Sequence, residues 1–211
     1  MKTPNTTTLL FVLFAVGNAS AGTVTLFNNF GPGNTYLPDS GYDIGPSATL
    51  AVAQSFTPSV NSTLTSLILG VSQASPGSDG IVISLQTDSG ANSPSGTILE
   101  SFSASGLPIF GIASSLTTEN SVLHPFLSAG TTYWLEVSPN SANTTAFWNF
   151  PFDWDFGTIW APSTGTCLSC VRSAMSVTAD TVPEPESIGM FTLGAMALFG
   201  LGIVKRHRSI L

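Results

Sequence analysis

Two carboxylates, Asp153 and Asp155, are the residues whose types and spacing come closest to a catalytic pair. Two carboxylic acids hydrolyse a glycosidic bond when one protonates the leaving oxygen and the other activates water or attacks the sugar. In a strand, residues two apart share a face, with Cα atoms about 6 to 7 Å apart. The same spacing arises when two acids simply face solvent, and no Asp-x-Asp-x-Asp-Gly loop is present to add calcium ligands. The pattern favours two solvent-facing acids, with glycoside hydrolysis and calcium binding as alternatives.

Nucleophilic catalysis needs a base beside the nucleophile, and bases are scarce in this chain. His124 is the only histidine between residues 22 and 182, and it lies among apolar residues directly before Pro125. We expect it to lie at the end of a strand over residues 122–126. No Gly-x-Ser-x-Gly turn is present to display a serine nucleophile. The sequence therefore predicts no catalytic residue, no cofactor and no metal, and a protein that is not an enzyme.

The only cysteines, Cys167 and Cys170, are separated by two residues. In an exported protein the oxidising surroundings favour a disulfide. Across so short a loop such a bond stabilises the fold by roughly 2 kcal/mol. Free thiols are an alternative, as are a redox pair, which would want a helix N-terminus, and a zinc site, which would need two more ligands.

Seven aromatic residues lie between Phe147 and Trp160, in the same segment as the two acids. In an extended chain the aromatic residues at 150, 152, 154 and 156 would share one face and the acids the other. Either these rings belong to the core, or some of them line a surface on which sugars stack, because flat rings complement the apolar faces of sugars. The candidates for a glycan-binding surface are Trp148, Trp154 and Trp160.

The elements that position these residues must be strands. Short alternating runs are separated by Gly, Pro, Asn, Asp and Ser, and no stretch of twelve residues in the middle of the chain shows a clear helical period. In TTYWLEV, for example, Tyr133 and Leu135 face one way while Trp134 and Glu136 face the other. The pattern predicts an all-β fold, an antiparallel β-sandwich of jelly-roll type. The predicted strands are Thr23–Phe27, Leu50–Phe56, Leu64–Val71, Ile81–Gln86, Ile98–Ser103, Val122–Phe126, Thr131–Val137, Thr145–Trp148 and Ala174–Thr178.

Residues 1–21 have the three-part layout of a secretory signal peptide. Lys2 supplies an early positive charge, and residues 9–16 form an unbroken apolar run that is too short to span a bilayer. Ala19 and Ala21 are the small residues at positions −3 and −1 of a cleavage site. We expect cleavage after Ala21 and export through the Sec translocon, which leaves a domain over residues 22–181.

The exported part of the chain is acidic. It contains ten acidic residues against a single basic one, Arg172, and no lysine. Nothing in it could neutralise phosphates, so no nucleic-acid partner is expected. Anionic lipid or polysaccharide would also be repelled unless divalent cations intervene.

The C-terminal segment has the features of a membrane span. Residues 187–204 contain no charge and would extend roughly 27 Å as a helix, enough for a thin hydrocarbon core. The tail 205–211 then begins with a basic cluster that includes Lys205, Arg206 and Arg208. Positive residues stay on the cytoplasmic side, so the pattern predicts one transmembrane helix with the domain outside.

Val182, Pro183, Glu184 and Pro185, followed by a short glycine-containing span and a basic cluster, resemble the PEP-CTERM sorting signal. The resemblance covers residues 182–211, with the motif at 182–186. It implies a Gram-negative bacterium that makes extracellular polysaccharide. It also implies a membrane-embedded exosortase that processes the protein near the motif and passes it from the inner membrane to the outside. The motif residues would then be substrate residues of that enzyme.

Residues 51–139 contain a second set of recurring patterns. These are an Ala-x-Ser-Phe strand, a Leu-Thr-Ser-Leu strand, a Leu-x-Thr-Asp turn with a Pro and a Gly before the next strand, and the run AGTTYWL. Together they look like the choice-of-anchor R type domain, although its adjacent Pro-Gly is Pro94-Ser95-Gly96 here. The resemblance implies an extracellular β-sandwich without an assigned biochemical role.

These patterns predict a non-enzymatic cell-surface or extracellular-matrix protein that is sorted by an exosortase and associated with exopolysaccharide or biofilm. One alternative is a carbohydrate-binding module that uses the aromatic segment 147–160. The other is a glycoside hydrolase that uses Asp153 or Asp155.

Overall fold

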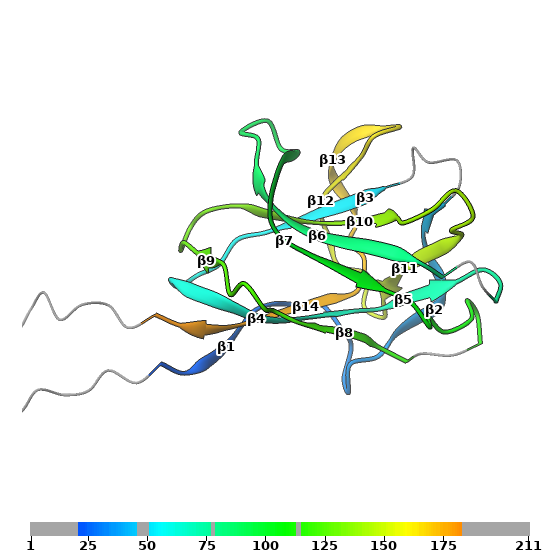
Figure 1. Ribbon diagram of the computed structural model, residues 1–211, viewed down its shortest axis with the longest axis horizontal. Coiled ribbons are helices and arrows are strands. Elements are labelled where there is room, and N and C mark those ends of the chain that lie inside the picture. The colour runs from blue at the N-terminus through cyan, green and yellow to red at the C-terminus, as the bar shows by residue number, and fades with distance from the viewer. Residues whose placement is uncertain (1–20, 46–50, 77–78, 113–114, 183–211) are drawn as a thin grey trace, which may run out of the picture. The chain divides into compact units, whose positions relative to one another are not determined.

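Short alternating runs of apolar and polar residues form antiparallel strands throughout the described part of the chain (Figure 1). The computed structural model describes residues 21–45, 51–76, 79–112 and 115–182, and these contain no helix. All pairs of named strands within them are antiparallel. The all-β prediction is therefore confirmed.

The larger sheet has six strands, which are β3 (Val52–Phe56), β6 (Ile81–Asp88), β7 (Pro94–Ala104), β10 (Tyr133–Pro139), β12 (Phe156–Ala161) and β13 (Gly165–Val171). Their order across the sheet is β13-β12-β3-β10-β6-β7. Both end pairs, β12–β13 and β6–β7, are hairpins. The tips of these hairpins meet where the Thr166 hydroxyl donates to the Asn92 carbonyl at 2.7 Å.

A second sheet consists of β1 (Thr23–Asn28), β4 (Ser62–Leu69), β8 (Thr117–Asn120), β9 (Phe126–Leu127) and β14 (Met175–Thr181). Its order is β1-β14-β4-β8, and β9 pairs with the other end of the same edge of β4. The third sheet contains β2 (Tyr36–Ile44), β5 (Val71–Gln73) and β11 (Ala146–Pro151), with β11 in the middle.

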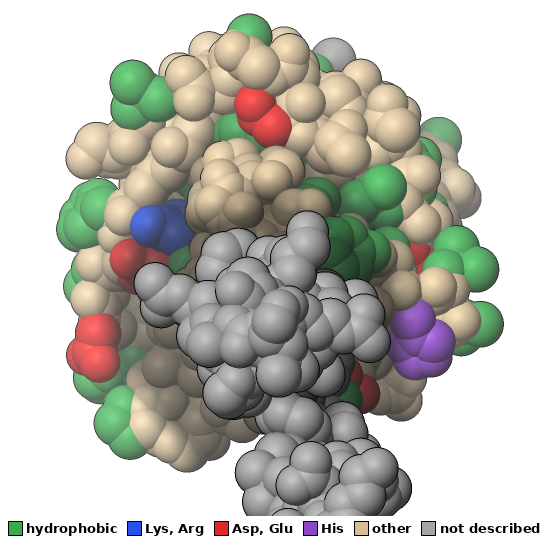
Figure 2. Space-filling view, turned by 90° about the vertical axis from the view of Figure 1, so that its left-hand side faces the viewer, with side chains coloured by type: hydrophobic (Ala, Val, Ile, Leu, Met, Phe, Trp, Pro, Cys, Tyr) green, Lys and Arg blue, Asp and Glu red, His purple; other side chains and the backbone are tan. Residues whose placement is uncertain are grey.

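The larger sheet and the second sheet face each other across the hydrophobic core, in a β-sandwich-like arrangement (Figure 1). Leu135 of β10 and Leu85 of β6 pair across the larger sheet, and Val177 of β14 pairs with Leu67 of β4 in the second. All four side chains belong to one buried cluster. Each such side chain stabilises the fold by about 1.5–3 kcal/mol when it leaves water. The end where β1 begins and β14 ends shows mostly uncharged side chains (Figure 2).

The alternation predicted for TTYWLEV is confirmed, because Tyr133, Leu135 and Val137 belong to the core cluster while Glu136 does not. The strand predicted over Val122–Phe126 is wrong. These residues form a loop, and only Phe126 and Leu127 pair with β4. Five strands were not predicted, namely β2, β5, β8, β12 and β13, although Val71 of β5 fell at the end of a predicted strand.

The predicted signal peptide, sorting motif and transmembrane helix lie outside the described residues, except for Ala21 and Val182. Within the residues that the structure describes, no helix is long and apolar enough to cross a membrane.

Candidate functional site

The aromatic segment is interrupted by a turn, which decides where its side chains point. Strand β11 ends at Pro151 and β12 begins at Phe156, so residues 152–155 do not form the continuous strand that the alternation suggested. Trp154 has φ of 45°, a left-handed conformation that is rare for a bulky residue. The prediction that Asp153 and Asp155 share one strand face is therefore wrong, and Trp154 is half exposed, with 50% of its surface accessible.

Asp155 holds this turn to the rest of the domain. Its carboxylate lies 3.3 Å from Nε of Arg172, and it accepts a hydrogen bond from the Asn29 side chain. Its backbone carbonyl accepts a 2.7 Å hydrogen bond from the Arg172 backbone N–H. The guanidinium of Arg172 also lies 5.1 Å from the centre of the Phe27 ring, within cation–π range. These contacts hold Asp155, at the C-terminal end of the strained turn, to the rest of the domain.

Trp154 continues a row of rings that begins on β2. The ring centres of Trp154 and Phe150 are 5.8 Å apart, and Phe150 meets Tyr42 edge to face at 4.9 Å. Both distances fall within the range of favourable aromatic pairs. We call Tyr42, Phe150 and Trp154 the aromatic row. Phe152 and Phe156, on either side of Trp154, are also exposed.

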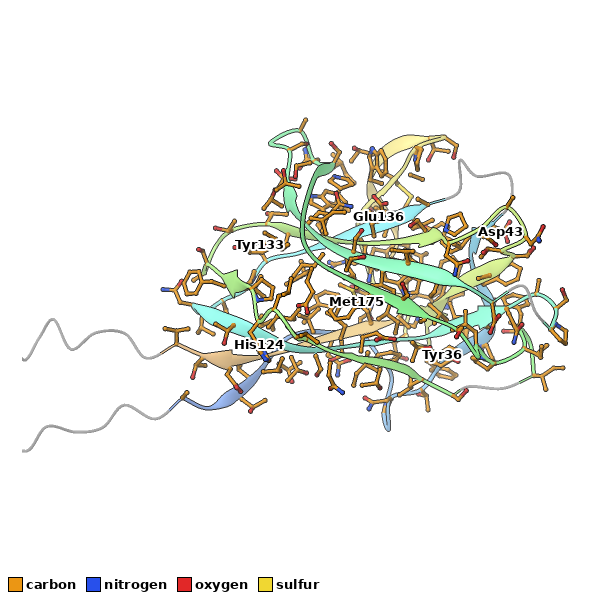
Figure 3. All side chains as sticks on the ribbon, in the orientation of Figure 1. Tyr36, Asp43, His124, Tyr133, Glu136 and Met175 are labelled. Carbon is orange, nitrogen blue, oxygen red and sulfur yellow. A yellow bond between two sulfur atoms is a disulfide. The ribbon has the colours of Figure 1, made fainter. Side chains whose placement is uncertain are left out.

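A pocket of about 250 Å³ opens beside the Tyr42 end of the aromatic row. Tyr42 and Asp43 line it from β2, and Val52 and Ile159 line it from β3 and β12. The hairpin between β12 and β13 adds Ser163 and Thr164. Asp43 lies at the exposed end of the third sheet (Figure 3). The pocket thus combines apolar walls with a carboxylate and two hydroxyl side chains, a mixture typical of sites for small polar ligands.

The predicted disulfide is present, and it forms part of the pocket wall. Cys167 and Cys170 are joined with an S–S distance of 2.06 Å, and both residues line the pocket. In this structure the two residues are therefore neither free thiols nor zinc ligands. The disulfide lies on β13 and lines the same pocket as Tyr42.

Of the three tryptophans predicted to bind glycans, only Trp154 belongs to the aromatic row. Trp148 is completely buried, and its indole N–H donates to the Ala174 carbonyl at 3.1 Å, so the prediction is wrong for this ring. Trp160 follows Ile159 on β12 and points to the opposite face of the larger sheet, away from the pocket. Tyr42 was not predicted, and Phe150 was named only as one ring of the aromatic segment, because the contact between the two depends on the pairing of β2 with β11.

The two acids considered for catalysis are not brought together as a pair facing the pocket. Asp155 is engaged by Arg172 and Asn29, Asp153 is exposed, and neither lines the pocket. Among the described residues, no three His, Cys, Asp or Glu side chains come together in a way that could hold a metal ion.

His124 lies in the loop before β9, with φ of 47°, and not in a strand as predicted. Its Nδ1 lies 3.0 Å from the Leu64 carbonyl oxygen, and its backbone N–H is bound by the Ser121 hydroxyl. The first contact ties the ring to β4, and the second ties the backbone of His124 to Ser121 in the same loop. His124 therefore has a structural position away from the pocket, whose lining comes from other strands.

Two further carboxylates have shifted pKa values, in opposite directions. Glu136, on the outer face of the larger sheet (Figure 3), has a pKa raised by burial, although a hydrogen bond from Gln86 opposes the shift. Burial also raises the pKa of Glu100, but hydrogen bonds from Ser121, Leu123 and Val122, together with the charge of His124, outweigh it and lower the pKa overall. Neither residue lines the pocket.

No protein-family model and no curated protein matches the chain.

Proposed function

We propose that this protein is exported, held at the inner membrane by its C-terminal segment, and sorted to the cell surface or extracellular matrix, where its domain binds exopolysaccharide along the aromatic row. The observation that supports binding most strongly is the half-exposed Trp154 ring on an anchored turn, in contact with Phe150 and through it with Tyr42 at the pocket. A strained conformation is maintained only where the surrounding contacts enforce it, and such positions concentrate at ligand sites.

The chemistry of the row and the pocket fits a neutral polysaccharide. Aromatic rings pack against the apolar faces of sugars, while Asp43, Ser163 and Thr164 offer partners for hydroxyl groups. The excess of acidic residues disfavours an anionic polymer unless divalent cations bridge the two. The proposed role is binding and attachment without catalysis.

The sorting half of the proposal rests on the two ends of the sequence. Residues 1–21 would act as the signal peptide and residues 187–204 as the transmembrane helix, with the basic tail in the cytoplasm. We assign residues 182–211 as a PEP-CTERM signal read by an exosortase. We also assign the domain to the choice-of-anchor R type, with a jelly-roll topology.

The sorting step is tested by replacing Pro183, Glu184 and Pro185 together by alanine in the cells that make the protein, followed by fractionation and mass measurement. The expected result is an unprocessed precursor that stays in the inner membrane. A variant with Thr118→Ala, an exposed position on β8, is the matched control and should be processed normally. Release and mass identical to the parent protein would contradict sorting through this motif.

A further inference from the structure

A second exposed surface is formed by the loop before β9 and by Phe126, the first residue of β9. Val122 and Leu123 expose 80% and 68% of their surface, and Phe126 exposes 50%. We call residues 122–126 the apolar loop. Three large apolar side chains within five residues form a patch of the kind that marks an interaction site.

The apolar loop is held in place by a buried carboxylate. Glu100 of β7 is only 4% exposed, and it accepts hydrogen bonds from the backbone N–H groups of Val122, at 2.6 Å, and Leu123, at 3.0 Å. It also accepts one from the Ser121 hydroxyl at 2.6 Å. Because both backbone N–H groups point inward, toward Glu100, the two side chains are turned outward. The exposure of Val122 and Leu123 is therefore a consequence of ordered hydrogen bonding.

The apolar loop lies close to the point where the chain leaves the domain. In the second sheet Ser62 of β4 pairs with Leu127 on one side and Thr181 on the other, which places these two residues about 10 Å apart. Asn61 joins both sides, since its carbonyl accepts from the Val182 N–H at 3.0 Å and its side chain accepts from the Ala129 N–H at 2.9 Å. Viewed onto this end, apolar side chains gather in places at the rim, some of them beside a histidine (Figure 2).

The length of the following segment limits how far this end can be from a membrane. Only residues 183–186 separate Val182 from the uncharged stretch 187–204. Four extended residues reach at most about 14 Å. If residues 187–204 span a bilayer, the end of β14 and the apolar loop must stay near the lipid surface. The domain has no lysine, so apolar contact and not attraction to anionic headgroups would hold it there.

We propose that the apolar loop contacts the outer surface of the membrane that anchors the protein, with Val122, Leu123 and Phe126 inserted at the level of the headgroups. The inference rests on the proposed membrane anchor and is independent of glycan binding. It gives the anchored precursor a defined orientation, in which the β8–β9 edge of the second sheet faces the lipid.

The test uses the protein with its C-terminal segment, reconstituted in phosphatidylcholine vesicles whose acyl chains carry bromine. A fluorophore is attached to Leu123→Cys and, in a matched control, to Ile112→Cys. Ile112 is 79% exposed and lies in the loop before β8. The neighbouring residues Ile109 and Phe110 pair with Gln73 of β5, which follows the end of β4 opposite to Ser62. The control position is therefore exposed but lies away from the apolar loop. We expect at least threefold stronger quenching by bromine at position 123 than at position 112.

Two further variants separate the apolar contact from the tether. A ten-residue Gly-Ser insertion after Val182 should leave the difference in quenching in place. The double substitution Val122→Ser with Phe126→Ser should abolish it.

Each other outcome overturns the inference in a recognisable way. Equal quenching at positions 112 and 123, in protein that resists alkaline extraction, would leave the anchor intact and remove the membrane contact. Loss of quenching on lengthening the linker would show proximity caused by the tether alone. A blue-shifted probe at position 123 without bromine quenching would indicate a protein partner or a second copy. Release of the whole protein at alkaline pH would contradict the anchor and the inference together.

Discussion

Asp155 and Arg172 lie 3.3 Å apart, carboxylate to guanidinium, and this pair holds the turn that displays Trp154. Arg172 is the only basic side chain between residues 22 and 182. The domain therefore places its single arginine beside the turn that carries its most exposed tryptophan. Loss of the ion pair would therefore both destabilise the turn and displace the Trp154 ring from the proposed binding surface.

Replacing Arg172 by methionine should destabilise the domain modestly. The ion pair is partly exposed and contributes up to about 1 kcal/mol, and the contact with the Phe27 ring adds about 0.5 kcal/mol or more. Together these give about 1.5 kcal/mol, and for a domain of this size we expect a decrease in Tm of about 3–6 °C. Thermal unfolding at low and high salt checks this, because salt screens the ion pair and should reduce the difference in Tm between the parent protein and the variant. A Tm difference that grows with salt would contradict a stabilising role of the ion pair.

Replacing Glu100 by glutamine should destabilise the protein at neutral pH. The carboxylate accepts three hydrogen bonds from residues 121–123, and hydrogen bonds to a charged group each contribute about 1.5–3 kcal/mol. Because the pKa of Glu100 is lower in the folded protein, its contribution is present above the unfolded pKa, near 4.3, and is lost as the pH falls through the folded value. Urea unfolding from pH 7 to pH 3 should show the gap between the two proteins closing.

Replacing Glu136 by glutamine should have the opposite effect. Burial raises the pKa of Glu136, so the ionised form is disfavoured by folding, and this cost is present at pH 7 and disappears below about pH 4.3, the unfolded value. Glutamine has no charge and retains an oxygen that can accept the hydrogen bond from Gln86. We expect the variant to be more stable than the parent at pH 7 and equal to it at pH 3.5. A loss of stability at pH 7 would show that the charge of Glu136 is favourable.

The strands that could be predicted from the sequence are those whose side chains alternate locally. The run TTYWLEV forms β10 as expected, because period-two alternation is a property of the chain itself. Strand β2 was not predicted. It contains Pro38, Asp39, Ser40 and Gly41, which are residue types typical of turns. A bulge opposite Asn149 and Phe150 accommodates this irregular stretch. No local sequence pattern predicts the bulge.

The candidate site was predicted only in part, for a related reason. The disulfide was predicted because the chain has two cysteines and is expected to be exported, and the structure contains this bond. The alternation in the aromatic segment predicted a continuous strand, and this prediction was wrong. The turn at residues 152–155 is stabilised by Arg172 and Asn29, which lie elsewhere in the sequence. The meeting of Tyr42 with Phe150 depends on the pairing of two strands about a hundred residues apart, and only tertiary structure can supply it.

Glycan binding at the aromatic row is tested most directly by changing Trp154 alone. Trp154→Gly removes the ring, and glycine adopts the positive φ of this position without strain, so the turn should persist. Trp160→Ala, a tryptophan on the other face of the sheet, is the matched control. Binding to the exopolysaccharide of the producing cells is measured by equilibrium pull-down, with circular dichroism to check the fold. We predict that Trp154→Gly weakens binding about tenfold, equivalent to 1.4 kcal/mol, while Trp160→Ala binds like the parent protein. Equal binding by Trp154→Gly and the parent would contradict the proposed surface.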